Sequence, residues 1–243
     1  MNIHHHEFRL VASEVDSRLR MPLSSLVVAI IDIATAHANR IGVGYDDMMK
    51  TNSSWVLSRL AIDITEMPRL GEDYRMSTWI TGISRLFSDR CFELRRLSDD
   101  AVVVSAHSVW MAIDMTTRRP SDLTALNAMT ERILDRPCAC LPASPLRPLA
   151  REAADYGFDY TVKVSDIDVN RHLTTRRYID LLVDLYDLPF YESHAISRFE
   201  IAFKREVRYG ETVAVSRGAD GAAMIASDPA SPNALSKMIF SND

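Results

Sequence analysis

Hydrophobic residues in the first half of the chain follow the two-residue period of strands, except in one long apolar segment. Residues 24–39 hold so few polar side chains that they predict a helix, and because it is apolar all round we expect it to be buried on every side. Turn residues separate the flanking strands, which are predicted at residues 8–15, 55–66, 74–84, 90–97 and 101–114. A short helix is predicted near residues 123–134. This half therefore predicts one antiparallel sheet around one central helix.

The same order of elements begins again after a proline-rich segment. Residues 137–148 hold four prolines, a density typical of linkers. A strand and a helix follow at residues 158–164 and 174–188, and further strands are predicted at residues 196–207, 212–217, 222–227 and 235–241. We therefore predict a first unit at residues 1–136, a linker at 137–154 and a second unit at 155–243.

The two halves also match residue by residue. The segment from Ser58 to Glu72 aligns without a gap with the segment from Ser197 to Glu211, at a constant spacing of 139 residues. Either the match is chance similarity between two strand-turn-strand segments, or one ancestral unit was duplicated, which the shared helix order favours. In this alignment Glu206 stands opposite Met67, so any chemistry that needs this carboxylate belongs to the second half alone.

Composition places the chain among ordinary globular proteins, with 47% hydrophobic and 25% charged residues. A formal net charge of -5 argues against nucleic acid or an anionic membrane as a bulk electrostatic partner. Three cysteines indicate reduced thiols, and we see neither a membrane span nor a secretory signal, so a cytoplasmic protein is expected. The run His4-His5-His6 is expected to be a solvated terminus rather than a metal site.

A dense polar motif precedes the second predicted helix. Asp168, Asn170 and His172 alternate with other residues, and in an extended segment such side chains project to one side and converge. The alternative is a polar loop, in which Asp and Asn form an Asx-turn and the histidine is merely exposed. Composition alone leaves both interpretations open.

The motif resembles the Asp-x-Asn-x-His motif of acyl-acyl carrier protein (acyl-ACP) thioesterases, and Tyr178-Ile179 follows it six residues on. A second match is the segment from Phe203 to Val207, which is similar to that family's strand ending in an Arg-Glu pair. The resemblance covers nearly the whole chain. It implies an α+β double hot-dog fold, in which each long helix is wrapped by its own antiparallel sheet, and hydrolysis of fatty acyl thioesters without a metal or organic cofactor.

The sequence departs from the family at two places. Thr175 stands where the family commonly has Asn, and Val207 stands where plant members often have Cys. Because a Cys-His-Asn nucleophile would need a thiol beside His172, hydrolysis by an activated water is the more economical mechanism.

The resemblance implies four catalytic residues in the second half. We expect Glu206 to act as general base towards water, while His172 and Asn170 position the water or the thioester carbonyl and Asp168 fixes their geometry through hydrogen bonds. Backbone N–H groups of residues 173–175, at the start of the helix, are expected to polarise the carbonyl.

Substrate contacts are predicted mainly in the first half. Trp55 and Trp79, with the apolar helix, are candidates for the wall of an acyl tunnel, and Thr175 is a third candidate contact in the second half. An acidic acyl carrier protein is the expected partner of a monomer or homodimer. Its attraction is ascribed to a basic patch of arginines at positions 69, 75, 85, 90, 95 and 96.

Two other functions remain open. A hot-dog dehydratase acting on 3-hydroxyacyl thioesters would also need a histidine and a carboxylate. An acyl-thioester sensor without turnover would need the fold but not the chemistry, and the presence of all four polar residues argues against it.

Overall fold

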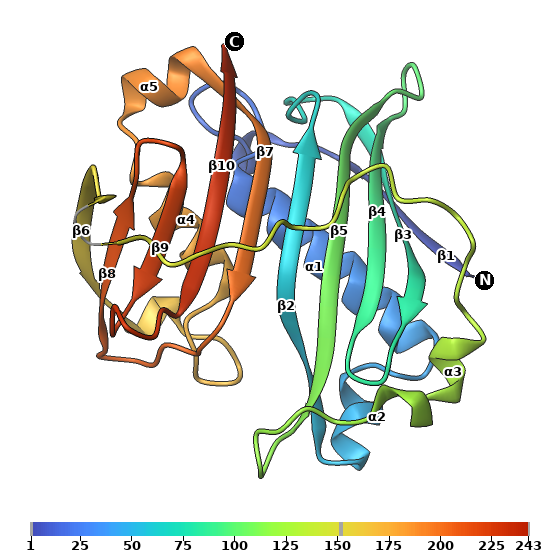
Figure 1. The fold of residues 1–243 in the computed structure, drawn as a ribbon. Coiled ribbons are helices and arrows are strands. Elements are labelled where there is room, and N and C mark those ends of the chain that lie inside the picture. The colour runs from blue at the N-terminus through green and yellow to red at the C-terminus, as the bar shows by residue number, and fades with distance from the viewer. Residues whose placement is uncertain (1, 151–152, 243) are drawn as a thin grey trace. The chain divides into compact units, whose positions relative to one another are not determined.

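The computed structural model describes residues 2–150 and 153–242 (Figure 1). Contacts divide the chain into two compact units, which are described separately. Unit 1 comprises Met1–Met21 and Ala29–Pro142, and unit 2 comprises Pro22–Val28 and Ala143–Asp243.

Unit 1 is built on an antiparallel sheet with strand order β1-β3-β4-β5-β2. Its strands are β1 (Ile3–Arg9), β2 (Ser53–Ile64), β3 (Asp73–Ile83), β4 (Ser88–Arg96) and β5 (Val102–Asp114). The last four strands confirm the predicted ones to within two residues. The prediction for the first strand was wrong, because Glu14 accepts a hydrogen bond from the Val11 N–H and closes a 3₁₀ turn there. The histidine run is part of β1, where His5 pairs with Ser77, and the His5 and His6 side chains are exposed to solvent, as predicted.

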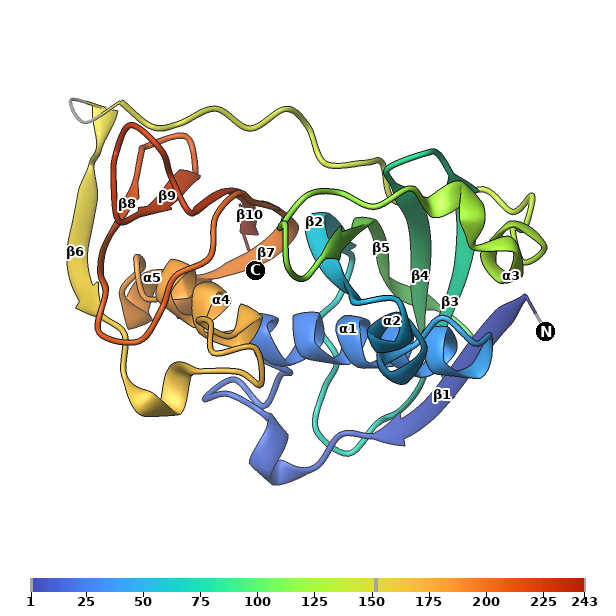
Figure 2. The same cartoon turned by 90° about the horizontal axis from the view of Figure 1, so that it is seen from below.

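The central helix of this unit comes from α1 (Leu23–Arg40), whose residues from Ala29 onward belong to unit 1 and lie against one face of its sheet (Figure 2). It ends where Gly42 adopts φ +77° and its N–H bonds to the Asn39 carbonyl. The helix is not buried on every side, as was predicted from its apolar sequence. A stripe of residues spaced three and four apart is exposed: Asp32, Thr35, Ala36 and Asn39. Short alanine and threonine side chains on that stripe hid this amphipathicity from a reading of hydrophobicity alone.

Shorter helices complete unit 1. α2 (Tyr45–Lys50) follows α1, while the helix predicted near residues 123–134 is only a 3₁₀ turn and the single-turn α3 (Asn127–Thr130).

Unit 2 repeats the plan with smaller parts. Its sheet has the antiparallel order β7-β10-β9-β8-β6. The strands are β6 (Tyr156–Thr161), β7 (His194–Phe203), β8 (Thr212–Arg217), β9 (Ala222–Ala226) and β10 (Ala234–Asn242). The one helix predicted here is two, α4 (Thr175–Val183) and α5 (Leu188–Ser193), because Asp187 caps a new helix by accepting the Phe190 N–H. Each unit thus places a helix on an antiparallel sheet, which confirms the predicted double hot-dog fold.

One turn recurs in both units with the same backbone. Gly71 and Gly210, which the sequence alignment pairs, both have φ +80°. Each donates its N–H to a residue that precedes the helix of its own unit, Gly71 to the Leu10 carbonyl and Gly210 to the Val162 carbonyl. This shared geometry supports duplication of one ancestral unit.

The proline-rich segment has no regular secondary structure, yet its side chains are docked. The Cys140 thiol contacts the Ala61 carbonyl at 3.5 Å within unit 1. Within unit 2, Leu146 and Leu149 pack against a buried cluster of Met224, Ala226 and Leu235. The segment therefore contributes to both hydrophobic cores.

We expect Gly221 to be more sensitive to substitution than Gly210. Both have φ close to +80°, so alanine costs roughly 1–2 kcal/mol at either position. At Gly221 a Cβ atom would also stand 2.1 Å from the Met238 carbonyl oxygen, whereas at Gly210 nothing lies within 4 Å. Denaturant unfolding should show a larger loss of stability for Gly221→Ala than for Gly210→Ala. Equal losses would contradict the close approach of Gly221 to the backbone of β10.

Candidate active site

The polar motif of unit 2 folds as a tight turn between β6 and α4. Asp168 Oδ1 accepts the backbone N–H groups of Asn170 at 2.8 Å and His172 at 3.0 Å. The Asp168 N–H in turn bonds to the His172 carbonyl at 2.9 Å, and Arg171 takes φ +64°. The motif is therefore not an extended segment with alternating sides, as was predicted. The Asx-turn, left open by the sequence, is what forms.

This turn brings His172 against a carboxylate from the segment that follows β7. The Leu173 N–H bonds to the Val207 carbonyl at 2.8 Å, and His172 forms an isolated antiparallel bridge with Arg208. As a result, His172 Nε2 lies 3.0 Å from Glu206 Oε2. The histidine side chain is 17% exposed and the glutamate 37%. Two residues 34 positions apart in the sequence thus bring an imidazole and a carboxylate into contact at the solvent boundary.

The other predicted site residues lie around this pair. Asn170 is exposed at the tip of the turn, and no described residue hydrogen-bonds its side-chain amide. Thr175 is the first residue of α4 and is partly buried, while its neighbour Thr174 caps that helix by accepting the Arg177 N–H. Asp168, Asn170 and His172 therefore share one turn, which presents His172 to Glu206.

The predicted use of helix N–H groups needs correction. The Leu173 N–H is bonded to the Val207 carbonyl and the Thr174 N–H to the Asp166 carbonyl, both at 2.8 Å. Neither donor is available to a substrate carbonyl, because both hold the turn to its surroundings. The sequence pattern located the start of the helix but not these main-chain partners.

A second carboxylate, Asp166, is buried next to the turn and holds its surroundings in place through hydrogen bonds. It is 1% exposed and accepts hydrogen bonds from the Tyr160 hydroxyl at 2.7 Å, the Lys163 N–H at 2.8 Å and Arg177 Nε at 2.7 Å. Burial disfavours its charged form, but these donors together hold the pKa of Asp166 below its ordinary value. The Asp166 carboxylate therefore links Tyr160 of β6 and Arg177 of α4 to the segment that carries the motif.

Asn233 is a site residue that the sequence analysis missed. It is 1% exposed, and its Nδ2 donates to the Glu206 carbonyl at 3.1 Å. Its own carbonyl accepts the N–H groups of Lys204 and Arg205 at 2.8 and 3.1 Å, and its Oδ1 accepts the Ser227 N–H at 2.6 Å. The asparagine thus fixes the backbone of the segment that ends in Glu206. A lone Asn in a polar turn gives no signal of this role.

The same turn exists in unit 1 without the chemistry. Asp16 Oδ1 accepts the N–H groups of Arg18 and Arg20 at 2.9 and 3.1 Å, and Leu19 takes φ +57°. The Met21 N–H bonds to the Pro68 carbonyl, as Leu173 does to Val207, and Arg20 forms a bridge with Arg69, as His172 does with Arg208. Arg18 and Arg20 therefore occupy the places of Asn170 and His172.

Duplication thus preserved the scaffold of the turn in both units. Only unit 2 places an amide, an imidazole and a carboxylate on it, because unit 1 has arginines at the first two places and Met67 at the third.

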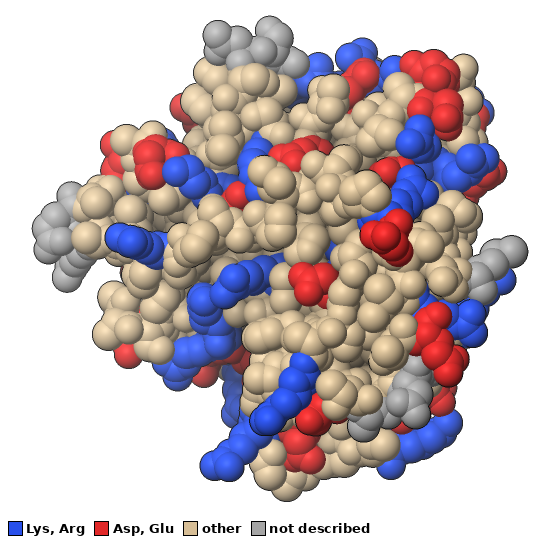
Figure 3. Space-filling model, turned by 45° about the vertical axis from the view of Figure 1, so that its right-hand side comes forward, with Lys and Arg blue, Asp and Glu red and all other residues tan. Residues whose placement is uncertain are grey.

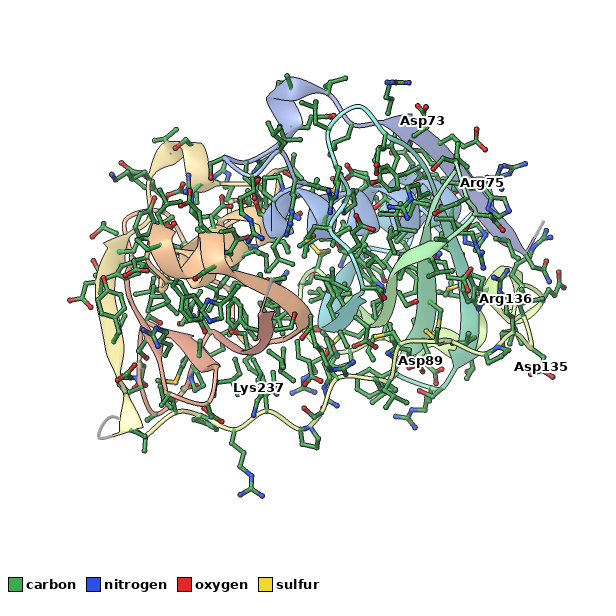
Figure 4. The ribbon with its side chains drawn as sticks, turned by 90° about the horizontal axis from the view of Figure 1, so that it is seen from above. Asp73, Arg75, Asp89, Asp135, Arg136 and Lys237 are labelled. Atoms are coloured by element: carbon green, nitrogen blue, oxygen red, sulfur yellow. The ribbon has the colours of Figure 1, made fainter. Side chains whose placement is uncertain are left out.

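The two tryptophans predicted to contact substrate, Trp55 and Trp79, lie in unit 1. Trp55 is partly buried, packs beside Val43 and Met48, and donates Nε1 to the Val43 carbonyl at 2.8 Å. Trp79 is fully buried under Arg136, whose guanidinium lies 4.4 Å from the ring centroid (Figure 4 labels Arg136). Trp79 alternates with Thr78, which contacts Arg90 on the α1 side, so the ring lies on the sheet face away from α1. The part of either ring in substrate binding stays a prediction.

The predicted basic patch does not form. Arg90 is only 4% exposed, and the other arginines of the set lie in ion pairs: Arg69 with Glu66, Arg75 with Glu7, Arg85 with Asp122, Arg95 with Asp100, and Arg96 with Glu66 and Asp99. Figure 3 shows blue and red side chains intermixed on one face of the molecule. Counting arginines overestimated the charge because nearby carboxylates neutralise it.

Membrane helices and metal clusters are both absent from the described part of the chain. No helix there is long and apolar enough to span a membrane. No group of three or more His, Cys, Asp or Glu side chains within those residues is arranged to hold a metal ion.

The geometry suits proton transfer to or from a bound water. An imidazole and a carboxylate in contact at 3.0 Å can share a proton, and the more exposed carboxylate meets solvent. A thiol nucleophile has no place in unit 2: all three cysteines precede residue 143, and the residue after Glu206 is the fully buried Val207.

Comparison with known protein families agrees with this geometry. Residues 1–126 match the acyl-ACP thioesterase N-terminal domain, and residues 150–228 match the acyl-ACP thioesterase C-terminal domain. A palmitoyl-acyl carrier protein thioesterase of Gossypium hirsutum, described as chloroplastic, is 24% identical over 209 residues. That match covers 82% of this chain and 51% of the relative, so the chain spans about half the length of this curated relative.

Two solved structures resemble the whole chain. An acyl-ACP thioesterase from Bacteroides thetaiotaomicron is 29% identical, with a TM-score of 0.88 and coverage of 99% of this chain and 98% of its own. A 12:0-ACP thioesterase from Umbellularia californica has a TM-score of 0.91 at 19% identity, with coverage of 100% and 98%. The second likeness concerns the fold alone.

The role of Asp168 can be separated from proton transfer. Because Asp16 builds the same turn where no such chemistry exists, we expect Asp168 to act as an acceptor of two N–H groups. Asp168→Asn keeps the acceptor oxygen and should retain turnover within about tenfold of the wild type, whereas Asp168→Ala should lose much more. Asp16→Ala is the matched control and should lower stability with little effect on turnover. A folded Asp168→Asn protein as inactive as a Glu206 variant would make Asp168 a proton-transfer group instead.

Asn233 should affect the rate more than substrate binding. Asn233→Asp keeps the acceptor for Ser227 but turns an oxygen towards the Glu206 carbonyl, and the repulsion should displace Glu206. A cost of about 1–3 kcal/mol predicts a fall in kcat of roughly 5- to 150-fold with a nearly constant KM. Ser227→Ala removes only the hydroxyl bond to Asn233 and should have a smaller effect. Steady-state kinetics with an unfolding control would check this, and an unchanged kcat would remove Asn233 from the site.

Proposed function

This chain belongs to the acyl-ACP thioesterase family, and on that premise we propose that it hydrolyses the thioester of fatty acyl chains held on acyl carrier protein. The reaction releases a free fatty acid and ends chain elongation in fatty acid biosynthesis. The observation that supports this most directly is the contact of 3.0 Å between His172 and Glu206 in the turn that matches the family's motif.

In the proposed reaction, Glu206 removes a proton from water as the water oxygen attacks the thioester carbonyl carbon. His172 Nε2 holds the carboxylate in place and shares the transferred proton. The tetrahedral intermediate then breaks its carbon–sulfur bond, and the proton passes to the departing thiolate of the carrier's prosthetic arm. No metal or organic cofactor takes part.

Asn170 and Asp168 have different parts in this scheme. The exposed amide of Asn170 can donate a hydrogen bond to the carbonyl oxygen, where charge develops in the transition state. Asp168 positions Asn170 and His172 through their backbone N–H groups and does not touch the substrate. The partly buried Thr175 is proposed as a neighbouring substrate contact.

A division of labour between the units follows from the duplicated turn. With arginines and a methionine in place of the polar set, unit 1 is proposed to bind the acyl chain, and unit 2 to carry out the reaction. Trp55 and Trp79 are proposed to shape the acyl site directly or through packing. The proposed partner is an acyl carrier protein, which would bind this protein as a monomer or homodimer. A cytoplasmic location is part of the same proposal.

Release of free thiol from acyl-ACP substrates of increasing chain length tests the function. Glu206→Gln and His172→Ala should each lower turnover by about 10²–10⁴-fold, since each removes one partner of the proton-sharing pair. Glu192→Gln, at an exposed position of α5, is the matched control and should remain active.

Either of two results would contradict the proposal. Full turnover in both folded site variants would place the reaction elsewhere. Absence of turnover at every chain length, with acyl ligands still bound, would favour an acyl-thioester sensor.

A further inference from the structure

A buried arginine in unit 1 has only neutral partners. Arg90, on β4, is 4% exposed, and its Nη1 lies 2.8 Å from His37 Nδ1 on α1 and 3.3 Å from the Thr78 hydroxyl oxygen on β3. No carboxylate within residues 2–150 or 153–242 forms an ion pair with it. Burial lowers the pKa of Arg90 to about 10, which leaves the guanidinium charged at neutral pH.

This environment differs from that of the neighbouring arginines. Arg136 and Arg95 both contact Glu93, and Arg96 contacts Glu66 and Asp99. All three are more exposed than Arg90, yet they have carboxylate partners. A charge taken out of water without a counter-ion is strongly destabilising, so packing alone does not explain Arg90.

The partner of Arg90 adds a second donor. Burial and the nearby Arg90 charge lower the pKa of His37 to about 3, so this fully buried imidazole is neutral. Because Arg90 can only donate, His37 Nδ1 must accept, and the ring proton therefore sits on Nε2. The structure gives this buried Nε2 no hydrogen-bond partner. The two side chains together present N–H groups and no acceptor.

The cluster lies within the hydrophobic interior of unit 1, on the side of the sheet that meets α1. Ser108 stands directly opposite Arg90 on β5, with Ala106 next to it on the same face. Both side chains are short, whereas Phe92 and Leu94 continue the face of β4 as large apolar groups. A ligand on this face would meet apolar walls and a few hydrogen-bond donors, the composition of a specific small-molecule site.

We propose that Arg90 and His37 recognise an oxygen atom carried by the acyl chain itself, so that the enzyme favours hydroxy-, oxo- or carboxy-substituted acyl groups over plain chains of the same length. The inference rests on the proposed function, since it takes unit 1 to be the acyl-binding unit. A plain hydrocarbon leaves the guanidinium without a counter-ion and the His37 Nε2–H without an acceptor, whereas a substituent oxygen supplies an acceptor for both groups.

Binding of non-hydrolysable analogues tests this independently of turnover. Amide-linked acyl-pantetheines of one length would be compared by calorimetry, either plain or with a hydroxyl, keto or terminal carboxylate group at successive positions. The amide has no carboxylate of its own to occupy the donors. The wild type, Arg90→Met and His37→Phe would be measured, with Arg75→Met, a paired arginine at the surface, as the matched control.

We expect at least one substituted analogue to bind the wild type about 10- to 100-fold more tightly than the plain one, as for hydrogen bonds to a charged donor. Arg90→Met should abolish or reverse this preference, His37→Phe should reduce it, and Arg75→Met should retain it. Equal or tighter binding of the plain analogue at every position, or a preference unchanged in a folded Arg90→Met protein, would overturn the inference. Loss of thioester hydrolysis with the binding preference intact would instead contradict only the proposed function.

Discussion

The site depends on one carboxylate oxygen that accepts two backbone N–H groups. Asp168 Oδ1 closes the turn on which Asn170 and His172 are carried, and it does so with main-chain donors that any residue supplies. The side chains at positions 170 and 172 can therefore differ without changing the conformation of the turn. The Leu173–Val207 hydrogen bond then sets the turn beside the segment that carries Glu206. Imidazole and carboxylate meet because two backbone interactions fix both ends.

The degenerate copy in unit 1 shows which part of this arrangement is structural. Asp16 closes the same turn, and the Met21–Pro68 hydrogen bond holds it in the same way, although arginines replace the reactive side chains. A feature shared by both turns, whatever side chains they carry, is part of the scaffold. Features found in unit 2 alone, namely Asn170, His172 and Glu206, are the ones left to explain by function.

Sequence reasoning succeeded where periodicity and local turn chemistry decide the outcome. Among the described residues, the nine strands that follow α1 and the two central helices were predicted, because alternation and apolar runs report directly on burial. It failed where a side chain accepts a hydrogen bond from a backbone N–H group. Glu14 closes a turn after β1 in this way, and Asp187 caps a separate helix, α5. The same cause turned the expected extended motif into an Asx-turn at Asp168. Which of the many polar side chains reaches a backbone N–H group depends on the folded structure, and the composition of the sequence does not show it.

The Asp16 turn of unit 1 was not predicted, because it does not fall at the constant spacing of 139 residues from the Asp168 turn. That spacing pairs Arg69 with Arg208, but the turns themselves lie farther apart, because the 18-residue α1 follows the first turn and the nine-residue α4 follows the second. The His172–Glu206 pair of unit 2 lies at the solvent boundary. Unit 1 instead buries its unusual charge, Arg90, against His37 of α1. The proposed hydrolysis consumes water and therefore needs a site at the solvent boundary. The proposed discrimination between acyl chains by a single hydrogen bond is strongest in a buried site, where water does not compete.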